Sequence, residues 1–374
     1  MSESFFLFPS SSQANEMSYA GGASLFVPEA WLPKDISKID IDPAVLPRIA
    51  KDQQLIVKIE RELPLIPTQH ELVNGDARNL KFLPTESIHL VLTSPPYWTL
   101  KKYNEHPDQL GSIGSYASFL EELDRVWEEC YRVLVPGGRL ICVVGDICLS
   151  RRKNGGVHTV VPLHASIQEH CRAIGFSNLA PIIWHKIANA KYESGKNEGG
   201  FFGKPYEPNA VVKNDIEFIL MEKKNGYRSP SLATRILSVV PADRHKVWFQ
   251  QIWMGLSGAS TRQHPAPYPL ELAERLVRMF SFVGDTVLDP FVGTGTTSAA
   301  AAKWGRNSIG VEVDPQYFKL CEARVREVIE GATAGKVKIR PCVLPLSVAE
   351  PVGRYGVGGR PPSGTFFAEF KLAS

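Results

Sequence analysis

From about residue 70 onward, short apolar runs alternate with amphipathic stretches, and this alternation restricts the possible fold more than any other feature. Runs of strand length lie within 70–75, 87–98, 139–146, 179–186, 215–224, 285–291 and 307–314. Apolar residues at helical spacing, three and four apart, lie within 115–138, 162–176, 268–282 and 296–305. Strands that alternate with helices predict an α/β fold with a mainly parallel, doubly wound sheet.

Cysteine spacing and the N-terminal sequence exclude several other classes of protein. The six cysteines include no C-x-x-C pair, so we expect neither a disulfide scaffold nor a metal site. The segment "MSESFFLFPSSSQ" lacks the basic start and long apolar run of a signal peptide. No stretch reaches the length of a membrane span, and we therefore expect a cytoplasmic protein with no membrane partner.

The segment "TSPPYW", residues 93–98, follows the apolar run 88–92 and has an unusual composition for the end of a buried strand. A hydroxyl, two prolines and two large aromatic side chains make this turn rigid, because each proline fixes its own φ and restricts the residue before it. A loop does not need such rigidity, whereas a site that grips a flat polar ring does. Taken alone, the segment could also be a proline-rich turn with core aromatics.

A second motif, "LDPFVGTGTT", places a glycine-rich turn between a strand and a helix. Gly293 and Gly295 let the backbone come close to a ligand, and Glu312 ends the next strand, where an acid can accept hydrogen bonds from ribose hydroxyls. Ser298 replaces the third glycine of the dinucleotide fingerprint, and there is no phosphate-binding G-x-x-x-x-G-K-[ST] loop. A nucleoside cofactor without a phosphate chain, S-adenosylmethionine, therefore fits better than a nicotinamide dinucleotide or a nucleoside triphosphate. For this motif alone, a structural turn with a surface glutamate is the alternative.

Together these segments resemble the amino-methylating DNA methyltransferases of the β order, which make N4-methylcytosine or N6-methyladenine. That family carries [S/D/N]-P-P-[Y/F] before F-x-G-x-G, and "TSPPYW" precedes "DPFVGTGTT" here. Further matches are "NGDA", "VLVPGGRLICVVGD", "IIWHK", "IEFILMEKK", "HPAPYP" and "GVEVD". The resemblance covers residues 70 to 330 approximately and implies a permuted chain order, with a mostly parallel seven-stranded sheet that contains one antiparallel strand.

The resemblance makes Ser94, Pro95, Pro96 and Tyr97 the candidate catalytic residues. An exocyclic amine is a weak nucleophile because its lone pair is delocalised into the ring. Acceptors for both of its protons, the Ser94 hydroxyl and the Pro95 carbonyl, would favour a pyramidal nitrogen with its lone pair aimed at the methyl group. The prolines would hold these acceptors in place, and Tyr97 would stack on a base that has left the duplex.

The resemblance likewise assigns residues to S-adenosylmethionine. Asp76 would contact the adenine amino group, and Glu312 would bind the ribose. The residues expected around the methionine end are Asp289, Phe291, Gly293, Gly295, Thr296 and Thr297. His264 in "HPAPYP" would help to close that end, or serve only as a packing histidine.

Basic residues gather in one part of the chain, although the whole chain carries a net charge of only +3. Residues 186–262 contain 12 Lys and Arg against 7 Asp and Glu, interleaved with aromatic residues, which suits a surface that follows phosphates. The family places its target-recognition region here, and the candidate contacts to double-stranded DNA are Lys191, Lys196, Lys204, Arg228, Arg235, Arg244 and Lys246. A solvated loop with ordinary lysines is the alternative for any one of them.

These predictions combine into one domain plan. An extension (1–65) precedes a catalytic half (66–187), a target-recognition insert (188–262) with an edge strand at 215–224, a cofactor-binding half (263–330) and a tail (331–374). We predict methylation of cytosine N4 in DNA, because Ser94 stands where adenine-modifying relatives usually carry Asp or Asn. Adenine N6, an RNA or small-molecule amine, and a catalytically silent nucleic-acid binder are the alternatives. A partner restriction endonuclease and a homodimer are compatible with this prediction.

Overall fold

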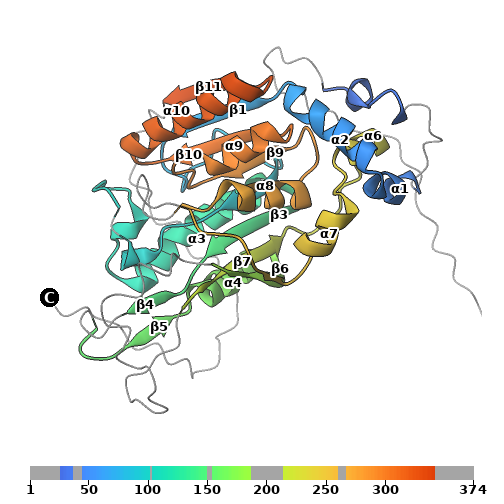
Figure 1. Cartoon of the computed structure of the whole chain (residues 1–374). Helices are drawn as coiled ribbons and strands as arrows, with labels where there is room; N and C mark the ends of the chain where they lie inside the picture. Colours follow the sequence, from blue (N-terminus) through green and yellow to red (C-terminus); the bar gives the residue numbers. More distant parts are fainter. Residues whose placement is uncertain are drawn as a thin grey trace, which may run out of the picture.

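The computed structural model describes residues 26–36, 44–101, 103–149, 154–186, 214–259 and 267–341, which form a sheet covered by helices on both faces (Figure 1). The sheet has nine strands. In sheet order these are β11 (Lys336–Pro341), β1 (Gln69–Asn74), β10 (Asn307–Glu312), β9 (Thr286–Asp289), β2 (Ile88–Thr93), β3 (Leu134–Val144), β7 (Ile216–Lys223), β6 (Ser177–His185) and β8 (Ile252–Trp253).

The mostly parallel α/β sheet confirms the predicted fold class, with two additions at its edges. The predicted sheet corresponds to seven central strands, which in sheet order are β1, β10, β9, β2, β3, β7 and β6. The outer strands β11 and β8 extend it to nine. β11 lies inside the segment 331–374 that the sequence led us to expect as a tail, so that prediction was wrong for this part. β7 runs antiparallel to both neighbours, β3 and β6, and is the one antiparallel strand of the seven. It is therefore an internal strand, and the prediction of an edge strand at 215–224 was wrong.

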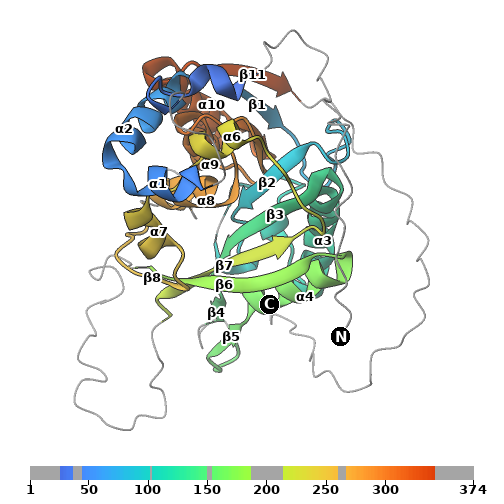
Figure 2. The same cartoon turned by 90° about the vertical axis from the view of Figure 1, so that its right-hand side faces the viewer.

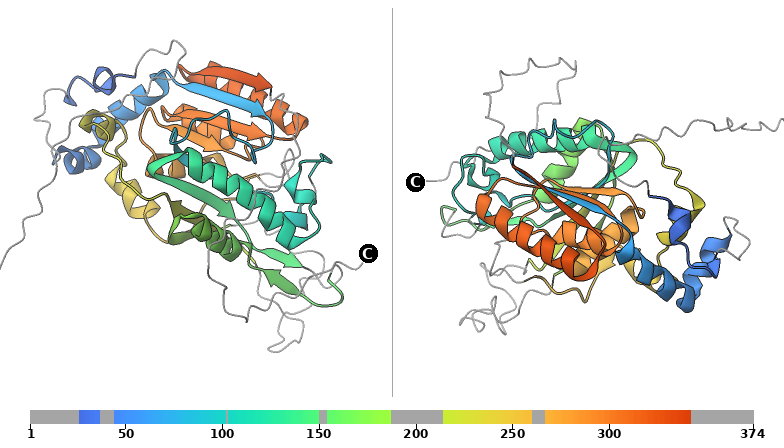
Figure 3. Two further views of the ribbon diagram at one scale, coloured as in Figure 1. Left: turned by 180° about the vertical axis from the view of Figure 1, so that it is seen from behind. Right: turned by 90° about the horizontal axis from the view of Figure 1, so that it is seen from above.

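Helices cover the two faces because the strands are apolar on both sides. α3 (Tyr116–Val133) and α4 (Leu163–Ile174) pack on one face, which Figure 3 shows from behind. α8 (Leu270–Phe280), α9 (Thr296–Lys303) and α10 (Pro315–Ala332) pack on the other.

Successive residues of the central strands point to opposite layers, as the strand period of two requires. Leu140 and Cys142 of β3 belong to the core beneath α3 and α4, whereas Ile141 and Val143 belong to the core beneath α8 and α9. All four side chains are fully buried. Burial on both faces fixes the register, because a shift by one residue would exchange the two sets.

A separate helical cluster closes the amino ends of the strands. It contains α1 (Val45–Lys51), α2 (Gln53–Glu62) and α6 (Leu232–Leu237), which share a small apolar core, and Figure 2 shows them gathered together. α7 (Ala242–Trp248) contacts α1. Val283 and Trp304, which precede β9 and β10, complete this core. The amino ends of the strands are thus occupied by packing, and this leaves the carboxyl ends for a site.

The remaining elements are short. They are the hairpin β4 (Ile147–Leu149) and β5 (Thr159–Val161), and the 3-10 turns η1 (Pro28–Trp31), η3 (Leu63–Leu65), η4 (Trp98–Leu100) and η5 (Leu110–Ser112). η4 and η5 both follow β2 and lie at its carboxyl end. No helix within the described residues has the length and apolar character that a membrane crossing requires.

Candidate active site

A pocket opens at the carboxyl ends of β1, β2, β9 and β10. The chain leaves β2 toward α3 on one face and leaves β9 toward α9 on the other face. β2 and β9 are neighbours, so the crevice between them is a topological switch point, where open α/β sheets bind ligands. The pocket is lined by Gly75, Asp76, Ala77, Ser94, Pro96, Tyr103, Asp108, Gln109, Leu110, Pro290, Phe291, Val311, Glu312, Val313 and Tyr317.

The rigid turn predicted at the end of β2 forms one wall of this pocket. Ser94 and Pro96 line it, and the Ser94 hydroxyl lies 3.5 Å from the hydroxyl of Tyr97. The two prolines are buried, and so is Tyr97, with 6% of its surface exposed. Burial raises the pKa of Tyr97 well above its ordinary value, so the phenol stays neutral. The Tyr97 ring belongs to the apolar core in this structure, and its stacking on a base stays a prediction.

Asp289 lies beneath the pocket and joins the ends of two strands. Its carboxylate accepts hydrogen bonds from the Thr93 hydroxyl at 2.7 Å, the Phe291 amide at 3.1 Å and the Tyr268 hydroxyl at 3.2 Å. The Thr297 hydroxyl is a further donor to Asp289. Burial raises the pKa of Asp289 despite these donors. Asp289 and Thr297 link the ends of β2 and β9 in a buried network, and their contact with a ligand stays a prediction.

The glycine-rich turn binds the end of β10 and packs closely against α10. Gly293 donates its amide to Glu312 across 3.0 Å, which ties the turn to the end of β10. Gly295 has φ +82°, and a Cβ there would lie 2.8 Å from Val325 of α10. The positive φ and the close packing against α10 both require glycine at 295, and its contact with a ligand stays a prediction. The Thr296 hydroxyl accepts a hydrogen bond from Arg324 at 3.0 Å, and Thr296 is buried.

Glu312 faces the pocket from the end of β10 with 7% of its surface exposed. Its two oxygens accept the amides of Gly293 at 3.0 Å and Asp314 at 2.9 Å. Each carboxylate oxygen has two acceptor sites, so both keep one for a ligand. Burial raises the pKa of Glu312 to about 7 in spite of these two amides.

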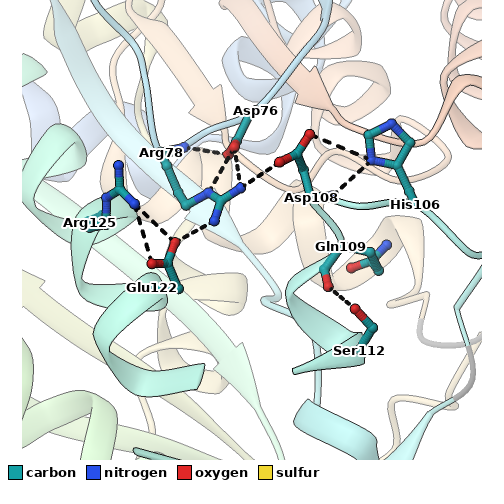
Figure 4. A network of polar contacts seen from close by, with 8 residues as sticks. All are labelled: Asp76, Arg78, His106, Asp108, Gln109, Ser112, Glu122 and Arg125. Atoms are coloured by element: carbon teal, nitrogen blue, oxygen red, sulfur yellow. Dashed lines mark hydrogen bonds and ion pairs between the residues drawn. The ribbon is translucent and has the colours of Figure 1, made fainter. Parts of the chain in front are cut away.

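A charged network holds the opposite wall (Figure 4). Arg78 donates to Asp76 at 2.8 Å and to Asp108 at 3.0 Å, and it also binds Glu122 of α3. Burial alone lowers the pKa of Arg78, but hydrogen bonds and the charges of Asp76 and Glu122 outweigh it and raise the pKa. The expected ligand contact Asp76 is thus oriented by an arginine that sequence reasoning did not single out.

Several pocket residues were missed in the sequence. Tyr103, Asp108 and Gln109 line the pocket from the stretch after "TSPPYW", and Tyr317 lines it from α10. The available signal was their position, because segments that follow the carboxyl end of a strand at a switch point are placed to contact a ligand.

The predicted DNA contacts that the structure describes lie near the amino ends of the strands. Arg228 forms a two-pronged pair with Asp285 at the amino end of β9, with its Nη1 2.7 Å from Oδ2. Arg244 pairs with Glu60 of α2 at 2.7 Å. Both lie at the amino edge of the sheet, where the strands begin, away from Ser94, and their assignment as DNA contacts stays a prediction.

The remaining predicted residues are either exposed on short helices or outside the described part of the chain. Arg235 on α6 and Lys246 on α7 are exposed, but their helices pack with the same amino-edge cluster. Lys191, Lys196, Lys204 and His264 lie outside the described residues.

Comparisons with known proteins agree on one family. The model of the N6/N4 DNA methylase family matches residues 88–323. The type II methyltransferase M.MjaI of Methanocaldococcus jannaschii is 36% identical, over 70% of this chain and 92% of its own length. A putative DNA modification methylase of Thermus thermophilus, solved with S-adenosyl-L-methionine, is 49% identical, covers 72% of this chain and 97% of its own, and has a TM-score of 0.59.

The cytosine-N4-specific PvuII DNA methyltransferase shares the fold at lower similarity. It is 18% identical, covers 73% of this chain and 96% of its own, and has a TM-score of 0.50. At this identity the likeness concerns the architecture alone.

Proposed function

The chain belongs to the N6/N4 DNA methylase family, and from this premise we propose that it transfers a methyl group from S-adenosylmethionine to cytosine N4 in DNA. The observation that carries the proposal is the shared pocket. Ser94 of the proline-rich turn and Glu312 of the following half of the fold open onto the same space at the switch point.

The residues around the pocket fit S-adenosylmethionine, which supplies an electrophilic methyl group on a sulfonium. Glu312 keeps acceptor positions for the two ribose hydroxyls. Phe291, Val311 and Tyr317 offer apolar surface for a flat ring, and Asp76 or Asp108 offers an acceptor for its amino group.

Ser94 and Pro95 would act on the base amine. Their oxygens accept its two N–H protons, which withdraws the nitrogen lone pair from conjugation and directs it at the methyl carbon. The N–C bond forms as the C–S bond breaks, and the nitrogen then loses one proton to solvent. No strong general base is required, because methyl transfer leaves the nitrogen positively charged, and this cation is acidic enough to lose its proton to water. The rigid prolines limit misplacement, which costs about 100-fold in rate for ~1 Å.

The preference for cytosine over adenine rests on Ser94. A hydroxyl at this position is a weaker acceptor than the carboxylate or amide of adenine-modifying relatives. Methylation of adenine N6 is the second candidate, since the family includes both activities. The intact proline-rich turn beside a formed pocket argues against a catalytically silent DNA binder.

Nucleoside analysis tests this proposal. The protein is incubated with duplex DNA and methyl-labelled S-adenosylmethionine, the DNA is digested, and the labelled nucleoside is identified by mass spectrometry. We expect N4-methylcytosine. N6-methyladenine alone would replace the base assignment and leave the cofactor assignment in place, and label only in protein or in small molecules would refute a DNA substrate.

Partners follow from the same proposal. Double-stranded DNA is the expected substrate, and the base must leave the duplex to reach Ser94. The name of M.MjaI, a type II methyltransferase, makes a cognate restriction endonuclease and a role in restriction–modification the natural context. A cytoplasmic location and a homodimer stay predictions.

A further inference from the structure

We propose that Tyr103 is a positioning residue that couples the cofactor pocket to the conformation of the catalytic turn. The coupling runs through residues 103–113, a segment that contacts both. This inference rests on the proposed function, since it concerns how the turn that holds Ser94 is kept in its active geometry.

The catalytic turn contains a residue in an unfavourable backbone conformation. Trp98 has φ +44°, in the left-handed region that side-chain-bearing residues rarely adopt. Such a conformation persists only where the surroundings over-determine it. Trp98 follows directly on Tyr97, so whatever holds this residue also sets the course of the chain beside Ser94.

Two hydrogen bonds from the segment 103–113 hold the strained position. The Tyr97 amide donates to the Tyr103 hydroxyl at 3.3 Å, and the Trp98 indole Nε1–H donates to the Ile113 carbonyl at 2.8 Å. One bond restrains the backbone before Trp98 and the other restrains its side chain. Trp98 is buried, with 1% of its surface exposed, so neither bond is readily replaced by water.

The same segment forms a wall of the cofactor pocket. Tyr103, Asp108 and Gln109 line the pocket. Asp108 is fastened to the opposite wall through Arg78, at 3.0 Å, and Arg78 in turn binds Asp76 (Figure 4). A ligand that fills the pocket therefore presses on a segment that binds the catalytic turn at both ends, through Tyr103 and Ile113, and binds Arg78 in between, through Asp108.

The Tyr103 ring has little freedom to move independently. A Cβ added at Gly111 would lie 2.5 Å and 2.8 Å from two carbon atoms of that ring. The backbone of Gly111 thus supports the ring from the side of η5. Because the ring is held here, a shift of the pocket wall is transmitted to the Tyr103 hydroxyl and so to the Tyr97 amide.

Tyr103→Phe separates the two contacts, because it removes the hydroxyl and keeps the ring. We expect the dissociation constant for S-adenosylmethionine, measured by calorimetry, to stay within about two-fold. The single-turnover methylation rate at saturating cofactor and DNA should fall roughly 5- to 50-fold, as for a small misplacement of a reacting group. The amide of Tyr97 should also exchange faster with deuterium in the free protein.

Tyr116→Phe is the matched control. It removes a tyrosine hydroxyl that bonds to Ser166 of α4 at 3.0 Å, outside the pocket. We expect this variant to keep the wild-type methylation rate, cofactor affinity and Tyr97 exchange.

The outcomes separate this inference from the proposed function. An unchanged rate and unchanged Tyr97 exchange in Tyr103→Phe would overturn the coupling. A parallel loss of cofactor affinity and rate would make Tyr103 a contact residue instead. If the wild type methylates no DNA, the proposed function fails, and the exchange of the Tyr97 amide still decides whether Tyr103 holds the turn.

Discussion

The amino edge of the sheet, where the strands begin, and the carboxyl edge, where they end, both bury charged side chains, but these side chains have different partners. At the amino edge, Arg306 is 1% exposed and donates to the carbonyl and hydroxyl of Ser281 and to the Trp304 carbonyl. Arg278 lies with its guanidinium carbon 4.0 Å from the centroid of a Trp304 ring and bonds to Glu60 at 2.8 Å. These cations are held by acceptors and ring faces of the chain itself.

At the carboxyl edge the buried acids face a pocket. Glu312 holds two amides and keeps acceptor positions open, and its pKa is raised to about 7 by burial. The difference teaches how to separate structural from functional charge in this fold. A buried charge whose partners come from the chain itself is part of the packing, whereas a buried charge with open acceptor positions at a switch point is available to a ligand.

Ser94→Ala should have the largest effect and acts on the carboxyl edge alone. The methylation rate is expected to fall about 10- to 1000-fold, because an acceptor for the amine is lost in the transition state. S-adenosylmethionine affinity should stay within a few-fold, since Ser94 contacts the base in this proposal. Single-turnover kinetics and calorimetry measure the two quantities, and a large loss of cofactor affinity would move Ser94 to the cofactor.

Arg228→Met should act on the amino edge and on stability. It leaves Asp285, which is 5% exposed, without its main cationic partner, and the free energy of unfolding should fall by about 3 kcal/mol. Arg326→Met removes an exposed pair with Glu322 and should cost under about 1 kcal/mol. Urea titration compares both variants. If Arg228→Met is as stable as the wild type but binds DNA weakly, Arg228 belongs to the functional edge after all.

Glu312→Gln should weaken S-adenosylmethionine binding by about 10- to 150-fold at pH 8. The wild-type carboxyl, with a pKa of about 7 in the free protein, must be ionised to accept both hydroxyls. Wild-type affinity should therefore decline as the pH falls from 8 to 6, while the affinity of Glu312→Gln stays flat in this range. Calorimetry at several pH values checks this, and parallel pH profiles would remove Glu312 from the ribose site.

The free protein gives an independent check on the sign of this shift. The folded pKa of Glu312 lies above its ordinary value of 4.5, so the stability from this group is full below pH 4.5 and is lost as the pH rises through about 7. Relative to Glu312→Gln, which has no carboxyl group at this position, the ligand-free wild type should accordingly lose stability as the pH rises from 4.5 through about 7.

The double variant Arg235→Ala with Lys246→Ala should have the smallest effect. Both residues are exposed on helices of the amino-edge cluster, so duplex DNA affinity should change less than about two-fold at fixed salt. A tenfold loss in a fluorescence binding assay would extend the DNA surface to the amino edge and break the comparison.

The alternation of strands and helices predicted the central sheet because burial on two faces leaves a periodic pattern in the sequence. β11 and α10 carried similar signals that were missed. Val337 and Ile339 alternate with charged residues along β11, and the buried Cys321 and Val325 have helical spacing in α10.

The pocket was only partly predictable for a different reason. Ser94 and Glu312 stand in recognisable motifs, whereas the partners of a basic residue depend on long-range folding. Arg228 and Asp285 are 57 residues apart, and nothing local in the sequence distinguishes this arginine from one that binds phosphate. The Arg78 link between Asp76 and Asp108 was hidden in the same way, since it spans 30 residues.

Hydrogen exchange with and without S-adenosylmethionine tests most directly whether the carboxyl edge is the functional one. We expect slower exchange in peptides that cover 74–78, 103–111, 290–295 and 312–317 when the cofactor is bound, and no change across 232–250. Protection confined to 232–250, or none at the carboxyl edge under saturating cofactor, would contradict the assignment of the pocket.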